Sequence, residues 1–211
     1  MAPTVIAICA RKGGANKSTI ALSLGCAAKQ ALLCDADPQQ SLVGWYHKRE
    51  LKLPECVTTP QPDQVRMAIR AERQPWYLID TPPHANLSEF IAFADFVIVP
   101  ARCSLMDLMA VATTLQQVKA AGKPGAIVLT SVPPGRGAAE AALVRSVKES
   151  LRTYEETFGI LVAPATIGHR QAFVQSLPSG QSALEYQPRG KAAEEVLALW
   201  SYVSAQAARS E

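Results

Sequence analysis

A glycine-rich segment with two lysines follows the first apolar run of the chain and could bind phosphate. Glycines let backbone N–H groups turn inward around an anion, and a helix that starts directly afterwards points its positive end at the same anion. In such a loop Lys17 would reach the β- and γ-phosphates of a nucleotide, and the hydroxyl of Ser18 would bind Mg²⁺. A glycine-rich turn without a ligand is the alternative. The residues of the segment are Lys12, Gly13, Gly14, Ala15, Asn16, Lys17, Ser18 and Thr19.

Three aspartates stand at the ends of two later apolar runs. Asp35 and Asp37 are two residues apart, so an extended strand would direct both to one face. A cap at a strand-to-turn junction is the other reading of that pair. Asp80 ends the run that begins at Tyr77, where a carboxylate could hold Mg²⁺ directly or through water. Phosphoryl transfer to water needs positioning and charge neutralisation, and two lysines, a metal and a carboxylate could supply both.

For the loop and the aspartates to meet, they must follow parallel strands, because ligands bind at the carboxyl ends of such strands. Short apolar runs do alternate with segments of helical spacing, which predicts one α/β domain over residues 1–211, with a doubly wound, mostly parallel sheet and helices on both faces. The segment Lys52–Asp63 is rich in Pro and Thr and is predicted to be irregular. Predicted strands are Val5–Cys9, Ala31–Cys34, Trp76–Ile79, Phe96–Val99, Ala126–Leu129 and Ile160–Val162. Predicted helices are Lys17–Lys29, Gln64–Arg70, Ser104–Ala121, Ala138–Thr157, Arg170–Ser176 and Lys191–Ala207.

The composition narrows the class of protein. The chain has 211 residues, of which 48% are hydrophobic and 18% charged, as expected for a globular protein with a sizeable core. The five cysteines form no C-x-x-C pair, which speaks against zinc and iron–sulfur sites. Three of the cysteines lie in apolar runs and are expected to be buried reduced thiols, which predicts a cytoplasmic protein. Neither an 18-residue apolar run nor a signal-peptide pattern is found, so a membrane span is not expected. A net charge of +3 permits contact with nucleic acid without arguing for it.

Taken together, these motifs resemble the ParA/MinD family of deviant Walker ATPases, which are P-loop NTPases. That family carries K-G-G-x-G-K-[ST], and Lys12 stands at its extra lysine. Asp35 opens a segment similar to the family's D-x-D-P-Q motif, and residues 77–83 resemble its Walker B strand with the following switch. The resemblance covers nearly the whole chain. Residues 94–100 resemble its A-D-x-V-I-x-P strand, and residues 168–173, 183–186 and 188–195 resemble the small ParA proteins of plasmid and cargo partition.

The resemblance implies a set of roles around ATP and Mg²⁺. Lys12 would cross to the other subunit's phosphates in an ATP-sandwich homodimer, and Lys17 would hold its own. Asp35 would support the Mg²⁺ shell with Ser18 and Asp80, and Asp37 would orient the attacking water. The switch over residues 81–83 would sense the γ-phosphate. Contacts to the nucleotide are expected from residues 12–19, from Thr130, which stands where the family often has an adenine-contacting Asn, and from Pro178.

The family further implies partners. An ATP-bound dimer would bind DNA non-specifically on the nucleoid, and a ParB-like or other cargo adaptor would stimulate its slow hydrolysis. The expected DNA contacts are Arg170, Arg189 and Lys191, through phosphates that carry no sequence information. Plain solvent exposure is an equal alternative for each of them. Weaker candidates on one predicted helix are Arg145, Lys148 and Arg152.

Other functions remain open at this point. A MinD-like membrane switch would need a basic amphipathic C-terminal helix, whereas the last helix has core-packing spacing at Val196, Leu197, Trp200 and Val203. A ligase would need a substrate domain, and a reductase would need cluster-binding cysteines. The histidines at 47, 84 and 169 are expected to be surface or structural residues rather than catalysts.

Asn16 stands where the family has glycine. Asn tolerates a positive φ better than most residues, so it could sit in left-handed space with its amide on a phosphate oxygen. It could instead hold the loop away from the phosphates. We expect retained binding with slow hydrolysis, which would make the chain a slow nucleotide switch.

Overall fold

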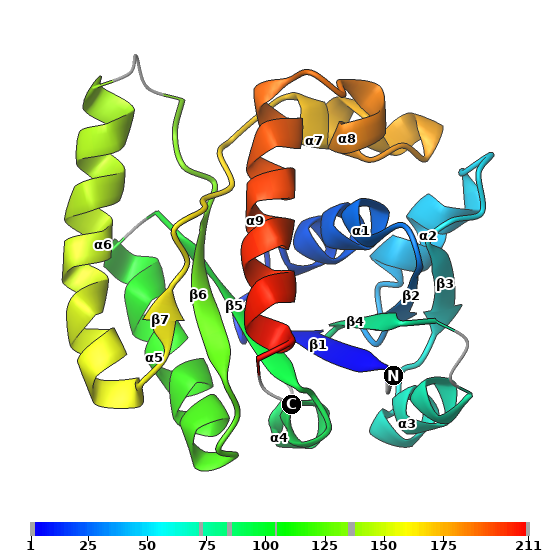
Figure 1. Ribbon diagram of the computed structural model, residues 1–211, viewed down its shortest axis with the longest axis horizontal. Coiled ribbons are helices and arrows are strands. Elements are labelled where there is room, and N and C mark those ends of the chain that lie inside the picture. Colours follow the sequence, from blue (N-terminus) through cyan, green and yellow to red (C-terminus); the bar gives the residue numbers. More distant parts are fainter. Residues whose placement is uncertain (1–2, 72–73, 84–85, 104, 135–137, 210–211) are drawn as a thin grey trace.

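A parallel seven-stranded sheet forms the centre of the protein, in the order β3-β2-β4-β1-β5-β6-β7 (Figure 1). The computed structural model describes residues 3–71, 74–83, 86–103, 105–134 and 138–209. The strands are β1 (Thr4–Ile8), β2 (Ala31–Asp35), β3 (Glu55–Thr58), β4 (Trp76–Asp80), β5 (Phe96–Arg102), β6 (Gly125–Thr130) and β7 (Leu161–Val162). The helices are α1 (Lys17–Ala28), α2 (Ser41–His47), α3 (Pro62–Arg70), α4 (Ser88–Ala92), α5 (Leu105–Ala120), α6 (Ala138–Phe158), α7 (Ala172–Gln175), α8 (Ala183–Tyr186) and α9 (Lys191–Ala207), with a 3₁₀ turn η1 (Leu177–Ser179).

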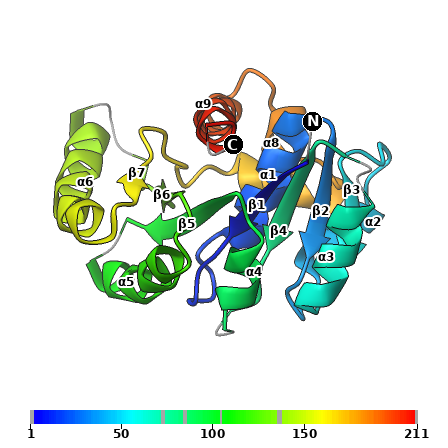
Figure 2. The ribbon, with the colours of Figure 1, turned by 60° about the horizontal axis from the view of Figure 1, so that its bottom comes forward.

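The strands are apolar on both faces because helices cover both faces of the sheet. Every residue of β2 is buried, and only the first residue of β1, β4 and β6 is partly exposed. Helices α1 and α9 lie on one face and α3, α4 and α5 on the other (Figure 2). Trp76 and Trp200 meet edge to face between the sheet and α9, with ring centroids 4.8 Å apart. The predicted doubly wound α/β architecture is confirmed.

The order of the strands brings the predicted motifs to one edge of the sheet. Strand β1 pairs with β4, and β4 pairs with β2, all in parallel. In this register Asp80 lies opposite Ile8 on one side and Asp35 on the other. The glycine-rich segment after β1 and the aspartates of β2 and β4 therefore emerge side by side.

Several short elements differ from the sequence prediction. The segment Lys52–Asp63 is not irregular throughout, because it contains β3 and the start of α3. Strand β3 has partly or fully exposed side chains and lies at the sheet edge, so its sequence lacks a core pattern. Helices α2, α4 and α8 were not predicted, and each has only four to seven residues. The helix predicted over Arg170–Ser176 is limited to α7.

Helix α9 packs its apolar side into the core, as its spacing predicts. Val196 and Val203 are fully buried, and Trp200 is half-buried. Leu197 is an exception, since it is 51% exposed and does not belong to the core face. Within the described part of the chain, no helix is both long enough and apolar enough to cross a membrane.

A buried arginine ties the C-terminal segment to the rest of the fold. The guanidinium of Arg49, just after α2, donates to the carbonyl oxygens of Leu51 at 2.9 Å and Gly180 at 2.7 Å. It also pairs with Glu185 of α8 at 2.7 Å and lies 4.5 Å from the ring centroid of Trp45. The Arg49 side chain is 2% exposed, so these partners must satisfy a charge that water does not reach.

We expect Arg49→Ala to lower the free energy of unfolding by about 2–3 kcal/mol, because it leaves the carboxylate of Glu185 without its partner. The side chain of Glu185 is 30% exposed, which keeps the loss below that of a fully buried pair. Arg152→Ala is the control, since Arg152 pairs with Glu149 at 3.1 Å on the exposed surface of α6, and its loss should lower the free energy of unfolding by less than about 0.5 kcal/mol. Urea unfolding measures both, and equal losses would contradict the role of Arg49.

Candidate nucleotide site

The glycine-rich segment forms a loop between β1 and the start of α1 at Lys17. Gly14 and Asn16 both have left-handed backbones, with φ of 71° and 67°. The carbonyl of Asn16 accepts the first helical hydrogen bond from the N–H of Ile20 at 2.9 Å. The free N–H groups of the first helical turn therefore face the loop, which suits an anion.

An open hollow of about 260 Å³ lies in front of this loop. Asp37 and Pro83 reach it from the segments that follow β2 and β4, as predicted from the strand order. Residues 81–83 thus contribute Pro83, whereas the hydroxyl of Thr81 is buried and donates to the carbonyl of Ile8 at 2.8 Å. The lining residues are Gly13, Gly14, Ala15, Asn16, Lys17, Ser18, Thr19, Asp37, Gln39, Ser41 and Pro83.

Asp80 and Ser18 form the part of the site that fits a metal. The hydroxyl of Ser18 donates to Oδ2 of Asp80 at 2.5 Å. Oδ1 of Asp80 is buried and has no hydrogen-bond partner in the described structure. Burial raises the pKa of Asp80 to about 7, against the hydrogen bond from Ser18 and the charge of Lys17, which lower it. A buried, unpartnered carboxylate oxygen beside a hydroxyl is a donor set that suits Mg²⁺.

Asp35 is fully buried and serves as an anchor in the structure. Its Oδ2 accepts the N–H groups of Leu42 at 3.0 Å and Val43 at 3.1 Å, and its Oδ1 accepts that of Asp37 at 3.2 Å. These bonds explain why α2 begins where it does, since the carboxylate satisfies the first N–H groups of the helix. Burial raises the pKa of Asp35, and the three backbone bonds oppose that rise. Its predicted place in the Mg²⁺ shell stays a prediction.

Asp37 lies at the rim of the hollow, where Oδ1 accepts the N–H of Gln39 at 2.9 Å. This bond turns the chain sharply after the aspartate pair. The carboxylate thus stands in front of the loop that would hold the phosphates. Its predicted role in orienting water stays a prediction.

Asn16 occupies left-handed space, as one of the two alternatives requires. Its side chain, however, does not point at a phosphate position. The Nδ2 atom of Asn16 donates to the hydroxyl of Ser131 at 2.8 Å, on the loop that follows β6. The predicted amide contact with a phosphate oxygen is therefore not the arrangement in this structure.

Two predicted nucleotide contacts do not line the hollow, and their role stays a prediction. Thr130 is fully buried, and its hydroxyl donates to the carbonyl of Ala101 at 3.4 Å. Pro178 is exposed on η1, next to Gly180, whose backbone packs against Arg49. The motif spacing predicted neither the burial of Thr130 nor the exposed position of Pro178 on η1.

Arg102 is a cation beside the loop that the sequence prediction missed. A Cβ atom built on Gly14 would lie 3.1 Å from Nη2 of Arg102, so the guanidinium covers this glycine. Arg102 also lines a small cavity together with Arg11 and Lys12. The signal in the sequence was its place at the end of β5, the strand that pairs with β1 on the side opposite β4.

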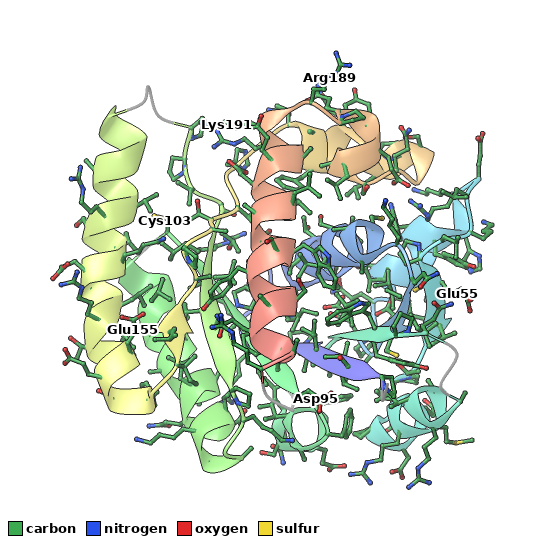
Figure 3. The ribbon with its side chains drawn as sticks, viewed as in Figure 1. Glu55, Asp95, Cys103, Glu155, Arg189 and Lys191 are labelled. Atoms are coloured by element: carbon green, nitrogen blue, oxygen red, sulfur yellow. The ribbon has the colours of Figure 1, made fainter. Side chains whose placement is uncertain are left out.

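The predicted DNA contacts divide into two kinds. Arg170 is 14% exposed, and its Nη2 and Nε bond Oε1 of Glu195 in α9 at 2.7 and 3.0 Å. The guanidinium thus links the segment before α7 to α9, and the predicted contact of Arg170 with DNA phosphate stays a prediction. Arg189 and Lys191 are exposed at the start of α9, near the top of the molecule in Figure 3.

The other basic residues and the described histidines lie on the surface or take part in local contacts. Lys148 donates to the carbonyl of Pro164 at 2.8 Å, and Arg152 pairs with Glu149 at 3.1 Å. Arg145 is exposed on α6. His47 ends α2 with its ring 6.4 Å from that of Tyr46, His169 is exposed, and residue 84 lies outside the described residues.

Comparison with known proteins identifies the family of the chain. Residues 6–181 match the family described as the CobQ/CobB/MinD/ParA nucleotide binding domain. The chain is 30% identical over 201 residues to a protein named maintenance of carboxysome distribution protein A from Gloeobacter kilaueensis, and the match covers 92% of this chain and 88% of that protein.

Two solved structures share the fold. One is the MinD cell division protein of Aquifex aeolicus, with a TM-score of 0.73, 14% identity and coverage of 96% of this chain and 97% of that one. The other is an ATP complex of a variant of Cyanothece McdA, with a TM-score of 0.66, 15% identity and coverage of 99% and 97%.

The chain belongs to the CobQ/CobB/MinD/ParA family of nucleotide-binding domains. Within that family it is a ParA/MinD-type ATPase with the α/β fold of a P-loop NTPase. The resemblance inferred from the motifs is thereby confirmed.

We expect Asp80→Asn to separate stability from ligand binding. Burial disfavours the ionised carboxylate of Asp80. Replacing this carboxylate with an uncharged amide should therefore leave the free energy of unfolding of the nucleotide-free protein at pH 8 unchanged or higher. The same variant should weaken Mg²⁺-dependent nucleotide binding by at least about tenfold, since a metal ligand is lost. Thermal unfolding and calorimetric titration measure the two effects.

Asp63→Asn is the control for this variant, because Asp63 is an exposed aspartate on α3. It should change neither quantity. A destabilised Asp80→Asn that still binds nucleotide with Mg²⁺ as tightly as the wild type would reverse both expectations.

Proposed function

We propose that the chain is a ParA-type positioning ATPase. ATP held with Mg²⁺ joins two copies into a sandwich dimer, the dimer binds DNA without sequence preference, and hydrolysis to ADP and phosphate releases it. The observation that carries the proposal is the meeting of the phosphate loop, Asp37 and Ser18 at one hollow, with the buried carboxylate of Asp80 hydrogen-bonded to Ser18 behind it.

Each residue of the site would have a separate role in hydrolysis. The loop N–H groups and Lys17 would hold the phosphates, while Lys12 would reach the phosphates of the other copy. Asp37, at the rim, would orient the water that attacks the γ-phosphate. Mg²⁺, held by Ser18 and Asp80, would neutralise charge on the phosphoryl oxygens. We propose that basal turnover is slow and that a partner stimulates it.

DNA contact is proposed for the exposed start of α9. Arg189 and Lys191 lie there together, and Figure 3 shows both at the same end of the molecule. Cations at such a place attract the phosphate backbone whatever the base sequence. Binding of this kind would place the ATP-bound dimer on the nucleoid in the cytoplasm.

The related protein whose name refers to carboxysome distribution supports a cargo for this chain too. We infer that a ParB-like or other adaptor links the ATPase to a plasmid, a chromosome region or a protein body. The MinD-like alternative would use a free amphipathic C-terminal helix, whereas α9 has its apolar side in the core.

Lys12→Ala and Asp37→Ala should have opposite effects on the dimer. Without Lys12, the cation that reaches the second copy is lost, so ATP-dependent dimerisation and hydrolysis should both fall by at least about tenfold. Without Asp37, ATP should still join the copies, and turnover should fall to a similar extent, which traps the dimer. Sedimentation with ATP and phosphate release measure the two properties. An unchanged ATP-dependent dimer in Lys12→Ala would contradict the sandwich.

Arg189→Glu and Lys191→Glu should each weaken ATP-dependent DNA binding alike for duplexes of different sequence. Each should also lower the slope of log affinity against log salt by about 1, because one phosphate contact is lost. Arg66→Glu is the charge-matched control, because α3 lies on the face of the sheet opposite α9. Gel retardation at several salt concentrations tests this. If the protein floats with liposomes in the presence of ATP and does not bind DNA, the MinD-like alternative is favoured.

A further inference from the structure

Asn16 and Ser131 form an unusual pair. They are 115 residues apart in the chain, and both are non-glycine residues with left-handed backbones, at φ of 67° and 51°. Left-handed conformations are strained for residues that carry a Cβ atom. A hydrogen bond of 2.8 Å joins the side chains of these two strained residues across the site.

The two ends of this bond differ in how firmly they are held. Ser131 directly follows β6, and the next residue, Val132, forms a parallel bridge with Gly168. Val132 donates its N–H to Ile167 at 3.2 Å and accepts the N–H of His169 at 2.7 Å. Ser131 is thus part of a fixed frame.

Asn16, by contrast, lies on the phosphate loop immediately before α1. Its backbone angles set the direction in which the first N–H groups of α1 and the side chain of Lys17 point. Glycine at this position would supply the left-handed turn without strain, but it would leave the loop freer before nucleotide arrives.

We propose that Asn16 is a positioning residue, whose hydrogen bond to Ser131 holds the phosphate loop in its nucleotide-binding shape before the nucleotide arrives. The chain thereby replaces the conformational freedom of glycine with a fixed link to the β6 loop. The inference rests on the proposed function, because it assumes that the loop binds nucleotide phosphates.

The link should act on binding and not on the chemical step. The loop N–H groups cradle the α- and β-phosphates, which ATP and ADP share. Breaking the link should therefore weaken both nucleotides by the same factor. Turnover of the saturated Ser131→Ala protein should stay unchanged, since Ser131 does not line the hollow and would not touch the attacking water.

A double-mutant cycle tests the link, using Ser131→Ala, Asn16→Gly and the combination of the two, with ATP or ADP and Mg²⁺ in calorimetric titrations. Ser131→Ala should raise both dissociation constants about fivefold, the size of one net hydrogen bond. In the Asn16→Gly protein, the same change at Ser131 should have less than about a twofold effect, because the bond is already absent.

Ser131→Gly is the second control. Glycine removes the hydroxyl and also relieves the strained angle at position 131. If the bond is what matters, Ser131→Gly should weaken nucleotide binding as Ser131→Ala does. Tighter binding in Ser131→Gly would show that strain at Ser131 dominates, and it would overturn the inference.

Three further outcomes have defined meanings. A weakened Asn16→Ala beside an unaffected Ser131→Ala would mean that the amide contacts phosphate directly, and equal effects of Ser131→Ala in both backgrounds would mean a general loss of structure. Either result overturns this inference and leaves the proposed function intact. A wild-type protein that binds neither ATP nor ADP would overturn the proposed function together with it.

Discussion

Two aspartates at paired positions of neighbouring strands impose the constraint on which the site depends. Asp35 and Asp80 lie opposite each other in the β2–β4 register, and both are fully buried. Like charges so close in a poorly solvated place repel, and the charge of Asp35 contributes to the raised pKa of Asp80. Asp35 is compensated by backbone N–H groups, whereas one oxygen of Asp80 has no partner in the described structure. The fold therefore creates a local need for a cation, which Lys17 meets in part and a bound metal would complete.

The parts of this arrangement that depend on local sequence could be predicted. An apolar strand followed by glycines, Lys17 and a helix can fold in few ways, and parallel strands fix the edge at which their carboxyl-terminal aspartates meet. The predicted α9 has the observed bounds because its apolar spacing is regular and its core contacts are extensive.

The parts that depend on distant partners could not be predicted. Helix α2 starts where it does because Asp35 receives its N–H groups, not because of its own composition. Arg170 is held by Glu195, which lies on another helix, so a motif could not tell a structural arginine from a DNA contact. The amide of Asn16 likewise has its partner 115 residues away.

The short outer strands of the sheet have a consequence for self-assembly. Strand β3 has four residues and β7 has two, so each rim of the sheet offers few backbone groups to another chain. Continuous strand-to-strand stacking, the route by which exposed sheets grow into fibrils, has little template here. Any association of copies would therefore rely on side chains and loops, whose positions a bound small molecule can change.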